Sequence, residues 1–189
     1  MANRARWGRG GWGLAGWTGT RATWDRHLSA AIATASPGTT FAVTDVRACY
    51  PSIGPETLRR SLGPSADVVV RLLERFGDGG VRGLPVGPDA SAVLANAILG
   101  RLDLALRRPG VRHLRWVDDV VLWGGRADVV RALARAHRTA SELGLELNPT
   151  KTAILADRDQ VRLRAWAGRS PYASGVRAAG PSAPIIAAP

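Results

Sequence analysis

The chain has 189 residues, of which 46% are hydrophobic and 22% are charged, an ordinary composition for a globular protein. This length allows one domain with a substantial core and is too short for two well-formed ones. Cys49 is the only cysteine, which excludes an internal disulfide and a zinc site built from cysteines, and no apolar run is long enough to span a membrane.

The formal net charge is +11, and the sequence pI is about 11.5. Such an excess favours a polyanionic partner, because basic side chains that meet phosphates release condensed counterions. An arginine-biased composition, as a GC-rich genome would give, is the alternative source of this charge. The N-terminus lacks the continuous apolar stretch of a secretory signal, so we expect a cytoplasmic protein without membrane contact.

Residues 1–39 form the first expected segment, rich in Gly, Arg and Trp over 1–24 and without a helical or strand period. We expect this segment to be partly disordered. Its interleaved arginines and tryptophans could alternatively stack on single-stranded nucleic acid. A short helix is predicted over 25–35, because Pro37-Gly38 would end it.

Residues 40–156 form the expected folded body, and 157–189 an Arg-rich and then Ala/Pro-rich tail. Strand and helix periods alternate along the body in the order β-α-α-β-β-α-β. This order predicts an α+β fold of the split βαβ type, with an antiparallel sheet and helices on one of its faces. The predicted elements are a strand at 41–44, helices after 55 and 65, a helix at 91–106, a hairpin at 111–123, a helix at 126–143 and short strands at 145–147 and 152–155.

Three aspartates stand out because each lies in an apolar, strand-forming context. Asp118 and Asp119 occupy the corner of the predicted hairpin, and Asp45 ends the strand at 41–44. Adjacent carboxylates repel, so solvent, an arginine or divalent cations must offset their charge. If the two strands are neighbours, the three carboxylates converge at one edge and suit Mg²⁺. The alternative is a solvated turn, the usual setting of a lone Asp-Asp pair.

Four segments in order resemble the palm motifs of reverse transcriptases: 41–53, 83–96, 115–119 and 143–152. The first is a strand ending in Asp with an aromatic five positions later. The second is a Leu-Pro-x-Gly turn leading into a helix, the third is an aromatic-x-Asp-Asp hairpin, and the fourth contains Asn-Pro-Thr-Lys. The resemblance covers about 40 to 155 and implies a polymerase palm.

The resemblance implies an RNA-directed DNA polymerase that adds dNTPs to the 3′-hydroxyl of a DNA or RNA primer on an RNA template. Asp45 and Asp118 would be the principal ligands of two Mg²⁺ ions, or of Mn²⁺ in their place, with Asp119 as the second carboxylate of its pair. Lys151, the only lysine in the chain, matches a lysine that acts as a general acid near the departing pyrophosphate.

Three further residues match nucleotide-binding positions of the family. Tyr50 would stack under the incoming sugar and exclude a 2′-hydroxyl, although an aromatic after a strand is also a common core residue. Gly87 would allow close backbone approach to the template–nucleotide pair. Ser91 would cap or open the helix that follows.

The match also departs from the family. Val86 replaces the usual glutamine, a pattern closer to prokaryotic defence-associated or diversity-generating enzymes. The flanking segments are too short for the fingers and thumb, so the polymerase would be either minimal or completed by a partner chain that supplies them. The alternative is a truncated, non-catalytic nucleic-acid-binding palm remnant. A palm-type nucleotidyl cyclase would share the carboxylates, but it should carry a Gly-Gly-Asp/Glu-Glu-Phe hairpin and no Leu-Pro-x-Gly turn.

Overall fold

The computed structural model describes residues 21–107 and 109–166; expectations for 1–20 and 167–189, including the first three tryptophans, lie outside this range. The strands form one antiparallel sheet in the order β2-β3-β1-β4. This confirms the α+β class. The elements in chain order are α1 (Arg21–Ala33), β1 (Thr40–Thr44), α2 (Cys49–Ser52), α3 (Pro55–Leu62), the 3₁₀ turn η2 (Gly63–Ala66), α4 (Asp67–Asp78), α5 (Asp89–Leu106), β2 (Val111–Trp116), β3 (Asp119–Gly124), α6 (Arg126–Glu142), β4 (Ala153–Leu155) and α7 (Arg158–Trp166).

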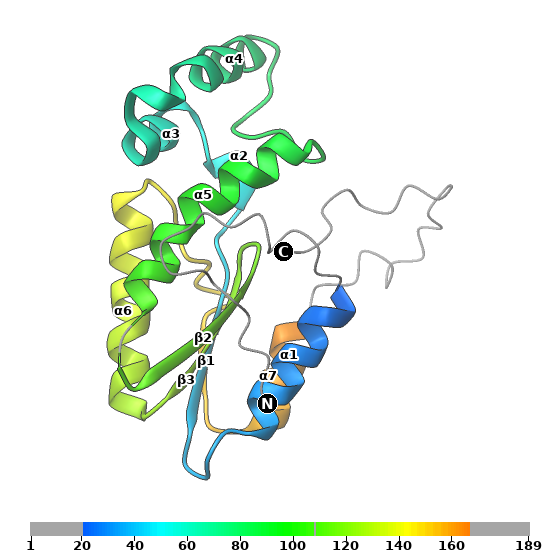
Figure 1. Cartoon of the computed structure of the whole chain (residues 1–189), viewed down its shortest axis with the longest axis vertical. Helices are drawn as coiled ribbons and strands as arrows, with labels where there is room; N and C mark the ends of the chain where they lie inside the picture. Colours follow the sequence, from blue (N-terminus) through cyan, green and yellow to red (C-terminus); the bar gives the residue numbers. More distant parts are fainter. Residues whose placement is uncertain (1–20, 108, 167–189) are drawn as a thin grey trace.

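Helices cover both faces of the sheet (Figure 1), so the expectation of helices on one face is wrong. On one face Ala42, Val120 and Leu122 pack into a core with the helices α2 to α6. On the other, Phe41 and Val43 pack against α1 and α7. Alternate residues of a strand point to opposite faces, so the all-apolar centre of β1 requires a cover on each side.

The helix α7 lies in the segment that was expected to be a tail. Its Val161 is fully buried against the sheet, and Arg158 at its start donates a hydrogen bond to the carbonyl of Ala35, just after α1. Trp24, which was assigned to the irregular N-terminal stretch, is 4% exposed within α1. The folded part therefore extends past both boundaries of the expected body at 40 and 156.

The helices α3 and α4 project beyond the end of the sheet at which β1 finishes and the β2–β3 hairpin turns (Figure 1). They pack on each other and on the main core through Leu58, Val70 and Leu73. Below them α5 and α6 lie against the sheet. No helix in the described parts of the chain is both long and apolar enough to cross a bilayer.

Candidate active site

The end of β1 and the β2–β3 hairpin bring the predicted carboxylates to the same edge of the sheet. Thr44 is paired with Val120 across β1 and β3, and the backbone N–H of Val46 donates to the carbonyl oxygen of Asp118 at 3.3 Å. Asp45 therefore lies beside the turn that carries Asp118 and Asp119. The strand pairing that the sequence analysis assumed is confirmed.

Asp45 is a buried carboxylate with an incomplete set of partners. It is 3% exposed, and its Oδ2 accepts a hydrogen bond from the ammonium of Lys151. Its Oδ1 is buried and has no hydrogen-bond partner within residues 21–107 and 109–166. A buried oxygen of an ionised carboxylate costs free energy when nothing donates to it, so this atom is a ready acceptor for a ligand.

The segment 146–152 is fastened to the end of β1 and sets the position of Lys151. The N–H of Asn148 donates to the carbonyl of Asp45 at 2.8 Å, and the hydroxyls of Thr44 and Thr152 are 2.7 Å apart. Within the segment, the N–H groups of Lys151 and Thr152 both donate to the carbonyl of Asn148. Only an isolated bridge between Val46 and Leu147 forms where a strand at 145–147 was expected.

The charge of Lys151 is balanced by all three aspartates. Its hydrogen bond to Asp45 raises the pKa of Lys151 above the ordinary value; partial burial opposes this rise, and the charges of Asp45, Asp119 and Asp118 add to it. The side chain is 55% exposed and thus reaches the site from solvent. The ammonium of Lys151 therefore interacts with all three carboxylates, and its exposure leaves it free to be replaced at Asp45.

The donor atoms suit a hard divalent cation, because Mg²⁺ prefers carboxylate oxygens and keeps part of its hydration shell. The Oδ1 of Asp45, which accepts no hydrogen bond from the described residues, fits such an ion. Within the described ranges, however, no three His, Cys, Asp or Glu side chains lie close enough together to hold a metal. Joint binding of an ion by Asp45, Asp118 and Asp119 stays a prediction.

The hairpin turn has a strained backbone, and a hydrogen bond from Arg115 stabilises it. Val117 has a φ of 51°, in the left-handed region that a β-branched residue rarely adopts. Its carbonyl oxygen accepts a hydrogen bond of 2.7 Å from Nη1 of Arg115. Arg115 is only 5% exposed and also binds Asp103 and Asn96 of α5.

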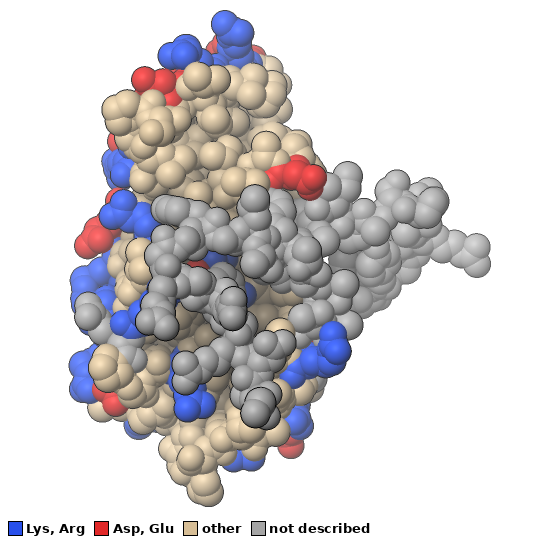
Figure 2. Space-filling model, in the orientation of Figure 1, with Lys and Arg blue, Asp and Glu red and all other residues tan. Residues whose placement is uncertain are grey.

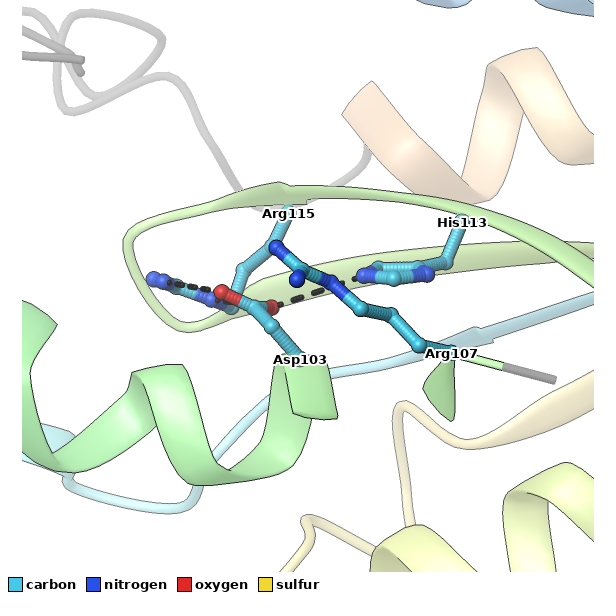
Figure 3. Close-up of a pocket in the computed structure, with 4 residues that line it drawn as sticks. All are labelled: Asp103, Arg107, His113 and Arg115. Atoms are coloured by element: carbon cyan, nitrogen blue, oxygen red, sulfur yellow. Dashed lines mark hydrogen bonds and ion pairs between the residues drawn. The ribbon is translucent and has the colours of Figure 1, made fainter. Parts of the chain in front are cut away.

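The sequence analysis missed the pair of Arg115 and Asp103. The available signal was weak: Arg115 lies between the apolar Leu114 and Trp116 in β2, so its side chain points to the opposite face of the sheet from theirs. Figure 3 shows Asp103, from α5, between the guanidinium of Arg115 and the ring of His113, both from β2. Arg107 completes a pocket of about 190 Å³ over them. Burial alone would raise the pKa of Asp103, but the charge of Arg115 and hydrogen bonds from His113 and Arg115 outweigh it and hold that pKa well below its usual range.

The structure places Tyr50 in the core beside the site. The ring is 8% exposed, and burial, with smaller contributions from Cys49 and Asp118, raises the pKa of its hydroxyl to about 12. This agrees with the alternative interpretation as a core aromatic, while contact with a nucleotide sugar stays a prediction. The hydroxyl oxygen has no hydrogen-bond partner among the described residues.

The Leu-Pro-x-Gly turn packs against the segment after Asp45. The N–H of Leu84 donates to the carbonyl of Tyr50 at 2.9 Å, and a Cβ at Gly83 would lie 2.4 Å from the carbonyl oxygen of Pro51. Gly87 has a φ of 121° and open space around it, which is compatible with the close approach predicted there.

The predicted cap of α5 is wrong. The helix begins at Asp89 with Pro88 as its N-cap, and Ser91 lies buried inside the first turn. The fixed φ of Pro88 suits the residue that precedes the helix and starts it two residues early.

No protein-family model matches this chain, and no curated protein matches it significantly. The interpretation of the site therefore rests on its residues and their arrangement.

Proposed function

We propose that this chain is the palm of an RNA-directed DNA polymerase, with its active site at the end of β1 and the β2–β3 hairpin. The observation that carries this proposal is the setting of Asp45, a buried carboxylate at a strand end beside Asp118 and Asp119. One of its oxygens accepts from Lys151, and the other has no donor among the residues that the structure describes. A buried carboxylate oxygen with a free acceptor position can take a cation or a hydrogen-bond donor.

Each residue then has a role that its position supports. Asp45, Asp118 and Asp119 would hold Mg²⁺, which when bound supplies charge stabilisation for phosphoryl transfer. Lys151 would donate a proton to the pyrophosphate leaving group, since an ammonium, unlike a guanidinium, can lose its proton. The hydrogen bonds around Asn148 hold the segment of Lys151 against Asp45, so the donor is positioned before substrate binds.

The proposed partners are an RNA template with a DNA or RNA primer, and dNTPs. The net charge of +11 supports a polyanionic partner. On the face shown in Figure 2, Lys and Arg lie at the α3–α4 end, along the α6 flank and at the lower end. A partner chain that supplies fingers or a thumb would add to the grip on the duplex.

The test is Mg²⁺-dependent dNTP incorporation on a primed RNA template, compared between the native chain and Asp118→Ala/Asp119→Ala. The matched control is Glu56→Ala/Glu74→Ala, which removes the same charge from exposed ion pairs on α3 and α4. We expect incorporation by the native chain and the control, and none by the aspartate variant. Equal incorporation by both variants would contradict the proposal.

A second candidate is a non-catalytic nucleic-acid-binding subunit or remnant. The contact between Lys151 and Asp45 favours it, because a permanent ion pair would occupy the carboxylate without any metal. Under this candidate the folded native chain would bind a primed template with strong salt dependence and incorporate no dNTP at any Mg²⁺ or Mn²⁺ concentration.

A further inference from the structure

The side chain of Arg115 links the long helix α5 to the turn that carries two of the three carboxylates. Its Nε and Nη2 donate to the two oxygens of Asp103 at 2.9 and 2.8 Å. Its Nη1 donates to Oδ1 of Asn96 at 3.0 Å and to the carbonyl of Val117 at 2.7 Å. Such a bidentate, planar arrangement fixes the guanidinium in position and orientation (Figure 3).

The receiving carbonyl belongs to the most constrained residue of the hairpin. Val117 is held at a φ of 51° between β2 and β3, and the next residue along the chain is Asp118. A β-branched residue leaves this conformation readily unless its surroundings hold it there. The hydrogen bond from Arg115 orients the peptide that joins Val117 to Asp118, so it bears directly on where the carboxylate of Asp118 points.

The other end of the link is equally rigid. Asp103 and Asn96 lie on α5, which packs on the sheet and on α6 through the buried Ile98 and Leu102. The chain that leads into α5 contacts Tyr50 and Pro51, close behind Asp45, through Leu84 and Gly83. The helix is therefore a common support for the hairpin and for the segment that follows Asp45.

We propose that Arg115, held by Asp103 and Asn96, is a positioning residue that sets the orientation of the Asp118–Asp119 turn relative to Asp45. The inference rests on the proposed polymerase activity for its catalytic consequence, whereas its effect on the turn stands independently of any activity. A lysine cannot replace Arg115, because it lacks the planar fork that binds Asp103 and Val117 together.

The decisive variant is Asp103→Leu/Arg115→Met, which removes both charges of the buried pair at once. Replacing a buried ion pair by apolar side chains of similar size often leaves a fold as stable as before, so this variant keeps the fold while the donor to Val117 is lost. The matched control is Arg112→Met, on the same strand at an exposed position. Arg115→Lys tests the geometry of the donor with the charge kept.

The first readout is amide hydrogen exchange of residues 115–120 by mass spectrometry, which requires no activity. We expect exchange in this segment to accelerate at least tenfold in the double variant and in Arg115→Lys, while the rest of the sheet and the control stay at the native rate. Native protection of the turn in a folded double variant would overturn the inference. If Arg115→Lys fails to fold, the double variant alone decides.

The second readout is steady-state dNTP incorporation. We expect kcat of the double variant to fall roughly 100-fold with the KM for dNTP nearly unchanged, because small displacements of catalytic groups carry penalties of this size. A purely structural pair predicts native kcat once the double variant is folded. An inactive native chain would count against the proposed polymerase but leave the exchange result to judge the turn.

Discussion

Two buried aspartates of this molecule differ in how their charge is compensated. Asp103 and Asp45 are 7% and 3% exposed, but Asp103 has both oxygens on Arg115, whose side chain is 3% exposed. Asp45 has one oxygen on Lys151, whose side chain is 55% exposed, and the other has no donor in the described part of the chain. A closed pair of the first kind serves architecture. An open one of the second kind has a counter-ion that a ligand can replace.

The largest expected effect separates the two aspartates by activity. Asp45→Asn should lower Mg²⁺-dependent incorporation by roughly 1000-fold or more, about 4 kcal/mol of transition-state stabilisation, because the neutral amide no longer attracts the ion. Its free energy of unfolding in urea should change by less than about 2 kcal/mol, since the lost charge was incompletely hydrogen-bonded. Near-native incorporation by Asp45→Asn would show that Asp45, like Asp103, has a structural role only.

The second effect is on stability. Asp103→Asn should cost about 3–5 kcal/mol of unfolding free energy, because it leaves the charge of Arg115 buried without its partner. Urea denaturation followed by far-UV circular dichroism measures this loss. The control is Asp159→Asn, whose side chain is exposed and pairs with Arg162 at the surface, and should change stability by no more than about 0.5 kcal/mol. If Asp103→Asn lost less unfolding free energy than the control, Asp103 would have no structural role.

The third effect concerns the proton donor. Lys151→Arg keeps a cation near Asp45 but removes a group that can lose a proton, so we expect incorporation to fall about 100-fold with little change in stability. Incorporation by Lys151→Met should fall by at least the same factor. Full activity of the arginine variant would show that Lys151 acts only as a counter-ion. The Asp45–Lys151 and Asp103–Arg115 pairs would then differ only in the solvent exposure of their basic side chains.

The site of Asp45, Asp118, Asp119 and Lys151 could be predicted from the sequence, because each of its parts has a local sequence signal. Asp45 follows an apolar strand, and Asp118 and Asp119 occupy a two-strand corner with clear alternation, so strand pairing alone brings them together. Lys151 was identified as the only lysine of an arginine-rich chain. That its ammonium contacts Asp45 follows from the backbone hydrogen bonds of Asn148, which sequence patterns do not contain.

The closed pair could not be predicted, because it joins a helix to a strand through side chains alone. No local sequence pattern around Asp103 or Arg115 indicates that they form a pair. Their contact depends on how α5 packs on the sheet. The same tertiary dependence determines which side chains of α6 are buried. There Ala132 and Ala136 are buried while Val130 and His137 are exposed, because small side chains let α6 approach α5 closely.

The smallest expected effect is on acid stability, and it tests the pair of Asp103 and Arg115 in a variant that keeps Asp45, Asp118, Asp119 and Lys151. The pKa of Asp103 is depressed in the folded protein, so its contribution is present above the unfolded value of about 4 and is lost as pH falls below it, at up to about 1.4 kcal/mol per pH unit. Arg115, His113 and Arg107 are the basic groups around it. Asp103→Leu/Arg115→Met should therefore lose less stability than the native chain between pH 5 and about pH 3 in urea titrations. Equal losses would mean that protonation of Asp103 contributes nothing to acid unfolding; the open carboxylates, which both proteins share, would then dominate the acid response.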